Sequence, residues 1–252
     1  MSWPFRTRDQ LLADQAAHPP FGTRTFGEGD GPVRVGVTGR GPTLLLLPWS
    51  ESDLARERAA GARLFGRLGI GGKMRVANAL PGALATPGAL IVGDVNEELG
   101  ALDVPVGEIE TAAAAAAAWE LLDRVGVNVL ILDPATAARL LESAPPRPRP
   151  WWQGIVWLCR PGTPVARPSA GDFGGWQRTW LAVAEASSFV GGECVQGRLH
   201  VEGVFSPAVE QDELVLGPLH PGVAWRYRTA LAARAGGPCP CGSPDPVFDL
   251  LR

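Results

Sequence analysis

Three cysteines and one histidine in the last quarter of the chain have the side chains that a metal ion needs. Cys194 and His200 are separated by five residues, and Cys239 and Cys241 flank a single proline. Zn²⁺ takes thiolates and imidazoles as ligands, and four protein ligands in a closed tetrahedron are typical of a structural site. A hairpin or turn could bring the first pair onto one metal, so the spacing predicts zinc, with unrelated thiols as the alternative.

Other residues that could act as nucleophiles or bases lack recognisable partners. His18 lies in a proline-flanked loop and His220 lies in a His-Pro-Gly turn, and neither has a Ser or Cys partner in the sequence. A nucleophilic centre needs such a pair within hydrogen-bonding reach. Cys159 follows Val-Trp-Leu and is interpreted as a buried hydrophobic residue.

The composition is that of a soluble globular protein, with 46% hydrophobic and 19% charged residues among 252. The net charge of -3 and the absence of a basic block argue against nucleic acid as a partner. The sequence has neither a signal core nor the run of ~20 apolar residues that a membrane helix requires. A cytoplasmic location is therefore expected, where cysteines favour metal binding or inert thiols over disulfides.

The first part of the chain alternates between strand and helix patterns. Thr7 is a predicted N-cap with Gln10 three residues later, and Ser50 or Ser52 caps the next helix. Strands are predicted over residues 33–37, 44–47, 74–77, 89–92, 103–106 and 127–132, and helices over 53–68, 111–124 and 133–142. This alternation predicts an α/β fold with a mostly parallel sheet and flanking helices.

The pattern changes after residue 144. A proline-rich stretch begins at Pro145 and is followed by a crowd of tryptophans, which are Trp151, Trp152, Trp157, Trp176 and Trp180. We interpret them as aromatic residues of a packed core, with a ligand-stacking role as the alternative. Short strands predicted over 198–201, 213–217 and 225–229 indicate a small β-rich C-terminal subdomain that carries the cysteine pairs.

Several segments match motifs that occur together in one enzyme family. Trp3-Pro-Phe-Arg-Thr-Arg-Asp-Gln-Leu11 resembles "LPFTTKEDL", and Pro20-Phe-Gly22 resembles "YPFG". Val35-Gly-Val-Thr-Gly-Arg-Gly-Pro-Thr43 stands where a phosphate loop "SSGTTGKPT" is expected, and Ser52 to Gly72 resembles "TRADL…AGVRPGD". Near the end, the chain follows the series "EC…GLH(V/I)…F.P", "GELV", "RYRT" and "C.CG" from Glu193 to Gly242.

In this order, the segments resemble the phenylacetate–coenzyme A ligase branch of the AMP-forming adenylating enzymes, as a truncated and degenerate member. The C-terminal motifs are the most specific, whereas residues 143–190 match poorly and look shortened. The resemblance implies adenylation of a carboxylic acid by ATP. It also strengthens the zinc prediction, because the same four positions are cysteine or histidine in relatives and bind zinc there.

The phosphate loop departs from the family pattern. Adenylation depends on positioning the ATP phosphates and stabilising their charge, which the family's loop does with hydroxyls, glycine N–H groups and a lysine. Here Val35 and Val37 replace hydroxyl residues, Thr38 and Gly39 are kept, and only Arg40 stands near the place of the lysine. A plain β-turn is the alternative interpretation of this segment.

Further departures affect the groups that hold the ribose and magnesium. Ala230 and Leu231 stand where the family has an acidic residue for the ribose hydroxyls. The nearest match to "YG.(S/T)E", whose glutamate helps to hold magnesium, is 189–193, but Glu193 belongs to the next motif. The family's C-terminal domain and its lysine are not expected here, and Lys73, the only lysine, lies in a predicted turn. Losing one such group costs about 2.7–4 kcal/mol of transition-state stabilisation, so we expect no adenylation by this chain alone.

These observations predict three parts: an α/β subdomain over 1–144, a Pro/Trp-rich shortened connection over 145–190, and a β-rich subdomain over 191–252 with the Cys₃His zinc site. The expected function is that of a catalytically silent relative that binds a protein partner or a small acyl or nucleotide ligand. The alternative is an AMP-forming acyl- or aryl-CoA ligase that works with a partner domain or an altered nucleotide site. Thr38, Gly39 and Arg228 are the residues that could contact a nucleotide. A structural subunit and a homodimer are left open.

Overall fold

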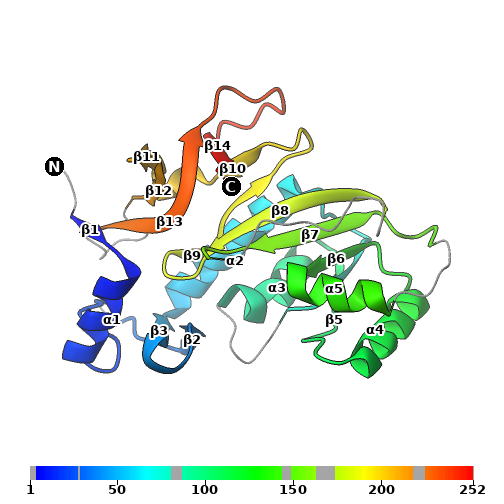
Figure 1. Ribbon diagram of the computed structural model, residues 1–252, viewed down its shortest axis with the longest axis horizontal. Helices are drawn as coiled ribbons and strands as arrows, with labels where there is room; N and C mark the ends of the chain where they lie inside the picture. Colours follow the sequence, from blue (N-terminus) through cyan, green and yellow to red (C-terminus); the bar gives the residue numbers. More distant parts are fainter. Residues whose placement is uncertain are drawn as a thin grey trace.

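The computed structural model describes residues 4–27, 29–80, 87–143, 149–162, 174–217 and 225–251. A 12-stranded sheet runs through the molecule in the order β11-β12-β13-β14-β10-β9-β8-β7-β6-β4-β5, with β1 paired to β13 (Figure 1). Its strands are β1 (Phe5–Arg6), β4 (Arg75–Asn78), β5 (Leu102–Pro105), β6 (Val129–Leu132), β7 (Gly154–Cys159), β8 (Trp176–Val183), β9 (Ser187–Glu193), β10 (Leu199–Val201), β11 (Ala208–Glu210), β12 (Glu213–Leu216), β13 (Arg226–Ala235) and β14 (Val247–Leu250).

A separate hairpin and five α-helices accompany this sheet within the described residues. The hairpin strands are β2 (Arg34–Thr38) and β3 (Leu45–Trp49), and two short 3-10 helices are η1 (Gly41–Thr43) and η2 (Gly203–Phe205). The α-helices are α1 (Arg8–Ala17), α2 (Glu51–Arg67), α3 (Pro87–Glu98), α4 (Ala112–Val125) and α5 (Pro134–Glu142). One face of the hairpin is buried, whereas Val35 in β2 and the flanking residues Val33 and Leu44 are exposed.

The strands β5, β4, β6, β7 and β8 are parallel, and helices cover them on both faces. Strand β6 is buried along its whole length, which its uninterrupted apolar sequence predicts for a strand with helices on both sides. Side chains of α2 and α3 pack on one face, and those of α4 and α5 pack on the other. The predicted α/β fold with a mostly parallel central sheet is therefore confirmed.

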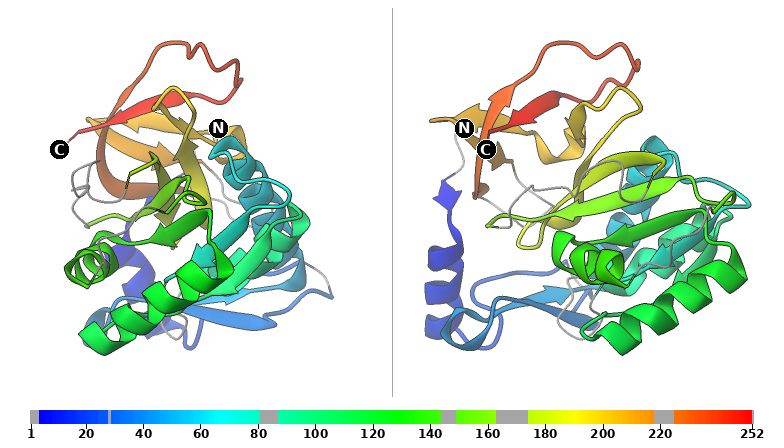
Figure 2. Two further views of the ribbon diagram at one scale, coloured as in Figure 1. Left: turned by 90° about the vertical axis from the view of Figure 1, so that its right-hand side faces the viewer. Right: turned by 45° about the vertical axis from the view of Figure 1, so that its right-hand side comes forward.

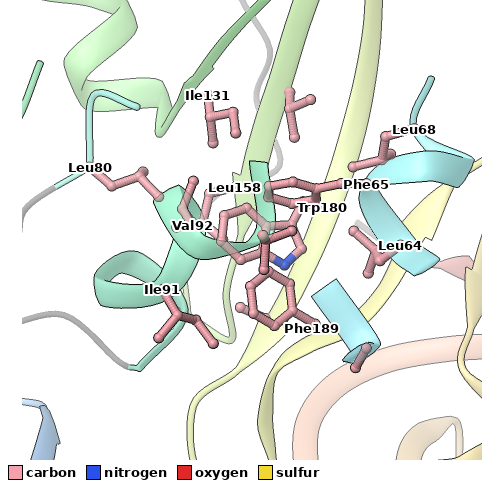
Figure 3. Close-up of a cluster of buried hydrophobic side chains, with 14 of the residues drawn as sticks. Leu64, Phe65, Leu68, Leu80, Ile91, Val92, Ile131, Leu158, Trp180 and Phe189 are labelled. Carbon is pink, nitrogen blue, oxygen red and sulfur yellow. The ribbon is translucent and has the colours of Figure 1, made fainter. Parts of the chain in front are cut away.

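The core between the sheet and α2 contains a cluster of three aromatic rings (Figure 3). The ring of Phe65 meets Trp180 edge-on at 5.3 Å between centroids and Phe189 at 5.6 Å. Trp180 and Phe189 are stacked at 5.1 Å. Trp157 is also buried, on the opposite face, so the interpretation of these tryptophans as core residues is confirmed for Trp157 and Trp180.

Polar residues begin the helices as predicted. Thr7 and Ser50 each form a reciprocal capping box with the residue three positions later, which satisfies two N–H groups that the first turn leaves unpaired. Thr111 and Asp133 accept the corresponding N–H bonds at the starts of α4 and α5. Of the two candidates for the cap of α2, Ser50 is the residue in that position.

The strand predicted over 89–92 is wrong, because these residues belong to α3. A short apolar run is compatible with a buried strand or with a buried helix segment, so periodicity alone does not separate them. Ile91, Val92 and Val95 are all buried and lie on the face of α3 that packs into the core. Burial of one helical stripe therefore decides the conformation here.

Residues 145–190, described above as a Pro/Trp-rich connection, contribute β7 and β8 to the middle of the sheet. From β8 onward, the sheet continues through the antiparallel pairs β8–β9, β9–β10 and β10–β14. The predicted short C-terminal strands correspond to β10, β12 and β13. The division of the chain into three parts stays a prediction. In the described part of the chain, none of the helices has both the length and the apolar character required to cross a membrane.

Candidate metal centre and adjoining cavity

The four predicted metal ligands come together at one end of the antiparallel part of the sheet. Cys194 follows the last residue of β9, and His200 is the middle residue of β10. The turn between these strands is closed by bonds from the Cys194 N–H to the Arg198 carbonyl (3.0 Å) and from the Gly197 N–H to the Cys194 carbonyl (2.9 Å). The other two cysteines lie in the loop between β13 and β14. Strand β14 pairs with β10, which brings this loop close to His200.

The ligand atoms have the spacing that a tetrahedral metal requires. The sulfur atoms of Cys194, Cys239 and Cys241 and a ring nitrogen of His200 all lie within 4.8 Å of one another. The Sγ atoms of Cys194 and Cys239 are 3.6 Å apart, and Cys241 Sγ is 3.3 Å from His200 Nε2. Zinc bonds of 2.3 Å to sulfur and 2.0–2.1 Å to nitrogen separate neighbouring ligand atoms by ~3.5–3.8 Å. The four residues therefore fit a metal ion.

Hydrogen bonds fix the tautomer of His200 and favour the thiolate form of Cys194. His200 is completely buried, and its Nδ1 lies 2.9 Å from the Asp245 carbonyl oxygen, which can only accept, so Nδ1 carries the proton. This leaves the lone pair of Nε2 on the side of Cys241. Burial alone raises the pKa of the Cys194 thiol, but backbone N–H groups of Arg198 and Gln196 and the adjacent ligands lower it to about 7. A thiolate is the form that binds a metal.

A second candidate site is a cavity of about 580 Å³ beside the ends of β7 and β8. Thr38, Gly39 and Arg228, the three predicted nucleotide contacts, all line it, although they come from opposite ends of the chain. Ligand sites in α/β sheets lie outside the carboxyl ends of parallel strands, and this cavity has that position. The sequence therefore selected three residues that the structure brings together.

The loop after β2 is closed around an arginine from α1. The Arg8 guanidinium donates to the carbonyl oxygens of Thr38 (3.0 Å) and Thr43 (2.8 Å) and pairs with the Glu185 carboxylate. Gly39 has a φ of +83°, and a Cβ there would lie 2.1 Å from the Thr43 carbonyl oxygen. The loop therefore needs glycine at this position, and its carbonyls face a cation of the protein itself.

Arg228 is also engaged by protein groups. It donates to Glu213 Oε2 at 2.8 Å and to Gln211 Oε1 at 3.2 Å, and its guanidinium lies over the ring of Phe5. The Ala230 N–H donates to the other carboxylate oxygen of Glu213, Oε1, at 2.7 Å. Leu231 packs against a third core cluster, which lies on the antiparallel part of the sheet and includes Cys159, Leu181, Val190, Leu214 and Phe248. It does not line the cavity, so the position expected to hold a ribose supplies no acceptor.

Five charged lining residues of the cavity were missed in the sequence, namely Arg8, Asp9, Arg160, Glu185 and Glu213. Arg160 and Glu185 follow the carboxyl ends of β7 and β8, and a polar residue directly after a buried strand is the signal that could have identified them. Glu193, the nearest match to the family's magnesium-binding glutamate, is not among the described residues that line the cavity, and its Oε2 accepts a 2.7 Å hydrogen bond from the Thr179 N–H. Burial, followed by the charge of Glu185, raises the pKa of Tyr227 in the cavity wall.

The remaining residues considered in the sequence lie outside both sites. The side chain of His18 is 60% exposed and pairs with Asp14, which confirms the surface assignment. Cys159 is buried in the third core cluster, as predicted. Lys73 lies in a turn with a φ of +68° and is not among the described lining residues of the cavity. His220 lies outside the described residues.

Comparison with known proteins gives structural matches only. No family model matches the chain, and no curated protein matches it. A structure of 2-hydroxyisobutyryl-CoA ligase in an open conformation with 2-HIB-AMP and CoA matches 97% of this chain at 19% identity, with a TM-score of 0.80. The chain covers 58% of that ligase, a little over half its length.

More distant matches are also enzymes or enzyme domains of this type. The amide bond synthetase McbA from Marinactinospora thermotolerans matches 93% of this chain and is covered over 51%, at 16% identity and a TM-score of 0.59. The N-terminal domain of FACL13 from Mycobacterium tuberculosis matches 97% of this chain and is covered over 66%, at 12% identity and a TM-score of 0.61. At these identities the likeness concerns the fold. The chain thus has the fold of AMP-forming, adenylate-forming ligases.

Proposed function

We propose that this chain is a catalytically silent relative of phenylacetate–CoA ligases that acts in the cytoplasm as a binding or accessory protein. In this proposal the Cys₃His cluster holds a structural zinc ion. The observation that carries the proposal is that Arg8, a cation beside the loop where the phosphates of ATP would be held, is already engaged by the carbonyl groups of Thr38 and Thr43 and by Glu185. The fold is kept while the groups needed for adenylation are replaced or engaged elsewhere.

The contents of the cavity support catalytic silence. Transition-state stabilisation requires donors aimed at the position where charge develops, and each missing donor costs about 2.7–4 kcal/mol. In the loop, hydroxyl positions are taken by Val35 and Val37, and the carbonyls of Thr38 and Thr43 bind Arg8. At the position where the family has a carboxylate for the ribose, this chain has Leu231, which does not line the cavity.

The donor set supports zinc rather than a catalytic metal ion. Three sulfur atoms and one imidazole nitrogen converge from two separate segments, and all four positions of a tetrahedron are taken by the protein. A closed site leaves no place for a reacting water. When bound, zinc would fix the loop between β13 and β14 onto the β9–β10 turn, and it would supply stability rather than chemistry.

The cavity supports a binding role for an anionic acyl or nucleotide ligand. Arg8, Arg160 and Arg228 all line it, and cations in a partly buried site attract carboxylates and phosphates. Glu185 and Glu213 neutralise two of these arginines in the present arrangement. A ligand would therefore have to compete with two internal ion pairs, which favours modest affinity.

The alternative is a ligase that works with a separately encoded partner domain. The observation that favours it is the convergence of Thr38, Gly39 and Arg228 on one cavity. Thermal shift with ATP, AMP and an aryl-CoA tests this function, because a ligand that binds the folded state raises apparent stability. A large shift with ATP would support the alternative, and no shift with any of the three would count against it.

Exchange of pyrophosphate into ATP, measured with a panel of aryl and fatty acids, tests catalytic silence directly. We expect no exchange above the protein-free background, with an active acyl-CoA ligase as positive control. Exchange that disappears in Arg228→Gln would come from this chain and not from a contaminant, and it would overturn the proposal. Zinc content is measured on the same preparation, so that the two parts of the proposal are judged separately.

A further inference from the structure

We infer that Asp245 and Arg67 are positioning residues for the metal centre. In this inference, Asp245 orients the imidazole of His200 through its backbone carbonyl, and Arg67 fixes Asp245 from the end of α2. The inference rests on the proposed zinc site and adds residues that neither the cysteine–histidine spacing nor the ligand geometry identifies.

Asp245 is held on several sides and leaves little freedom to its carbonyl group. Its carbonyl oxygen accepts from His200 Nδ1 at 2.9 Å, and its Oδ1 accepts from the Gly203 N–H at 2.9 Å. Its Oδ2 pairs with the Arg67 guanidinium and accepts from the Ser243 hydroxyl at 3.3 Å. The side chain therefore determines where the carbonyl lies, and the carbonyl determines the ring orientation of His200.

Arg67 is the last residue of α2, and its side chain is largely buried. Besides Asp245 it pairs with the carboxylate of Glu202, at 3.0 Å from Oε1, and Glu202 is also bound by Arg63 at 3.2 Å. A buried carboxylate without its partner is costly, which keeps this group of charges in one arrangement. Arg67 thus provides a rigid support that comes from a different part of the sequence.

The end of α2 reaches the metal centre because the helix lies along the sheet beneath β9 (Figure 2). The centre itself is built from the β9–β10 turn and the loop before β14, which belong to the antiparallel part of the sheet. The Arg67–Asp245 pair links it to the helix that covers the parallel part. Groups that orient a metal-binding histidine commonly contribute about 10–100-fold to metal affinity.

The test compares zinc affinity in Asp245→Asn and Arg67→Met with that in the wild-type full chain. Competition with a chromophoric chelator gives the affinity for Zn²⁺ alone, and the visible spectrum of the Co²⁺-loaded protein reports the ligand geometry. We expect each variant to bind zinc about 10–100-fold more weakly. The loss of zinc-binding free energy in the double variant should not exceed the sum of the losses in the two single variants, because both residues act through one carbonyl.

Asp123→Asn is a matched control. Asp123 pairs with Arg149 at 3.0 Å, both side chains are 13% exposed, and the pair belongs to the α4 region far from the metal ligands. The corresponding exposures of Arg67 and Asp245 are 14% and 19%. The control should lose comparable stability while its zinc affinity and Co²⁺ spectrum stay unchanged. Arg67→Lys keeps the charge but not the planar fork, so it should bind zinc more tightly than Arg67→Met does and more weakly than the wild type. It replaces Asp245→Asn in the comparison if that variant fails to fold.

The outcomes separate this inference from the proposed function. If the wild type binds zinc and Asp245→Asn or Arg67→Met binds it as tightly as Asp123→Asn does, the positioning role is wrong and the zinc site stands. If the wild type binds neither Zn²⁺ nor Co²⁺, the zinc site itself is wrong and the positioning role falls with it. Weaker binding in the Asp245 and Arg67 variants alone supports both.

Discussion

The metal centre and the cavity differ in what their polar side chains contact. At the centre, the four ligand atoms face one another, and the bonds to the rest of the protein are made with backbone groups, as in His200 Nδ1 with the Asp245 carbonyl and Cys194 Sγ with the Gln196 N–H. In the cavity, the charged side chains are paired with other side chains, as in Arg8 with Glu185 and Arg228 with Glu213. One site presents its ligands to an ion, and the other satisfies its charges internally.

This difference indicates what each site requires. A structural metal demands a fixed set of ligand types at short distances, so losing any one ligand removes the function. A cavity can keep its shape while its charges pair with one another, because such pairs stabilise the fold without a ligand. The same fold can therefore hold a set of metal-ligand atoms beside a cavity whose charged side chains are paired with one another.

The largest effect is expected from removing one metal ligand. In Cys241→Ser, a hydroxyl replaces the thiolate that faces His200, and we expect equimolar zinc in the wild type and none in the variant. At zinc concentrations about 1,000-fold above Kd, bound metal contributes about 4 kcal/mol to the free energy of unfolding, and this should be lost. Metal analysis and urea unfolding measure the two quantities.

Cys159→Ala is the matched control for this experiment. Cys159 is buried in the third core cluster and is the cysteine that does not belong to the ligand set. The control should lose some packing energy but keep its zinc. If the wild-type protein contained no zinc, the proposed contrast would be wrong, because the Cys₃His cluster would not bind a metal ion.

The parts of the molecule that could be predicted from sequence are those that depend on local spacing. The cap residues Thr7, Ser50, Thr111 and Asp133 are recognisable because the bond they form spans only three residues. The metal cluster is recognisable because few residue types bind zinc, even though its two halves are far apart. Both patterns have a direct physical reason that the sequence displays.

What could not be predicted depends on contacts between distant residues. The Arg8–Glu185 pair joins residues that are 177 positions apart, and no motif around either residue indicates the other as its partner. The segment 89–92 shows the same limit, since its helical conformation is decided by the core that it packs against. The cavity could therefore be located from its loop motif, but the state of its charges could not.

A second, smaller effect concerns a buried acid next to the cavity wall. Glu57 of α2 accepts from the Ser187 hydroxyl at 2.5 Å and from the Ser188 N–H at 2.9 Å, just after the turn that carries Glu185. Burial raises its pKa from 4.5 to about 7, although the two hydrogen bonds oppose the shift. The folded state therefore binds this proton more tightly than the unfolded state does.

The resulting pH dependence has a definite sign. The stabilising contribution of the Glu57 proton is fully present below pH 4.5 and is lost as the pH rises through about 7. A shift of this size corresponds to roughly 3 kcal/mol between these limits. Urea unfolding at pH 5 and pH 8 should show the loss in the wild type and not in Glu57→Gln, which stays neutral. Equal losses in both proteins would mean that Glu57 is ionised or solvated in the folded state.

The smallest effect tests how firmly the loop is closed around Arg8. In Gly39→Ala, the new Cβ would lie 2.1 Å from the Thr43 carbonyl oxygen, at a φ of +83° that already disfavours alanine. Gly29 has a similar φ of +75° but nothing within 4 Å of a new Cβ, so Gly29→Ala measures the conformational cost alone. We expect Gly39→Ala to cost about 1–3 kcal/mol more, as for overpacked sites.

The free energies of unfolding of the two alanine variants are compared by urea denaturation at one pH. An excess cost at Gly39 means that the carbonyls of Thr38 and Thr43 are held in place by Arg8, so the loop resists rearrangement around a phosphate. Equal costs would mean that the loop moves aside without penalty. The cavity could then open for a nucleotide, and the ion pairs of Arg8 and Arg228 would not prevent binding.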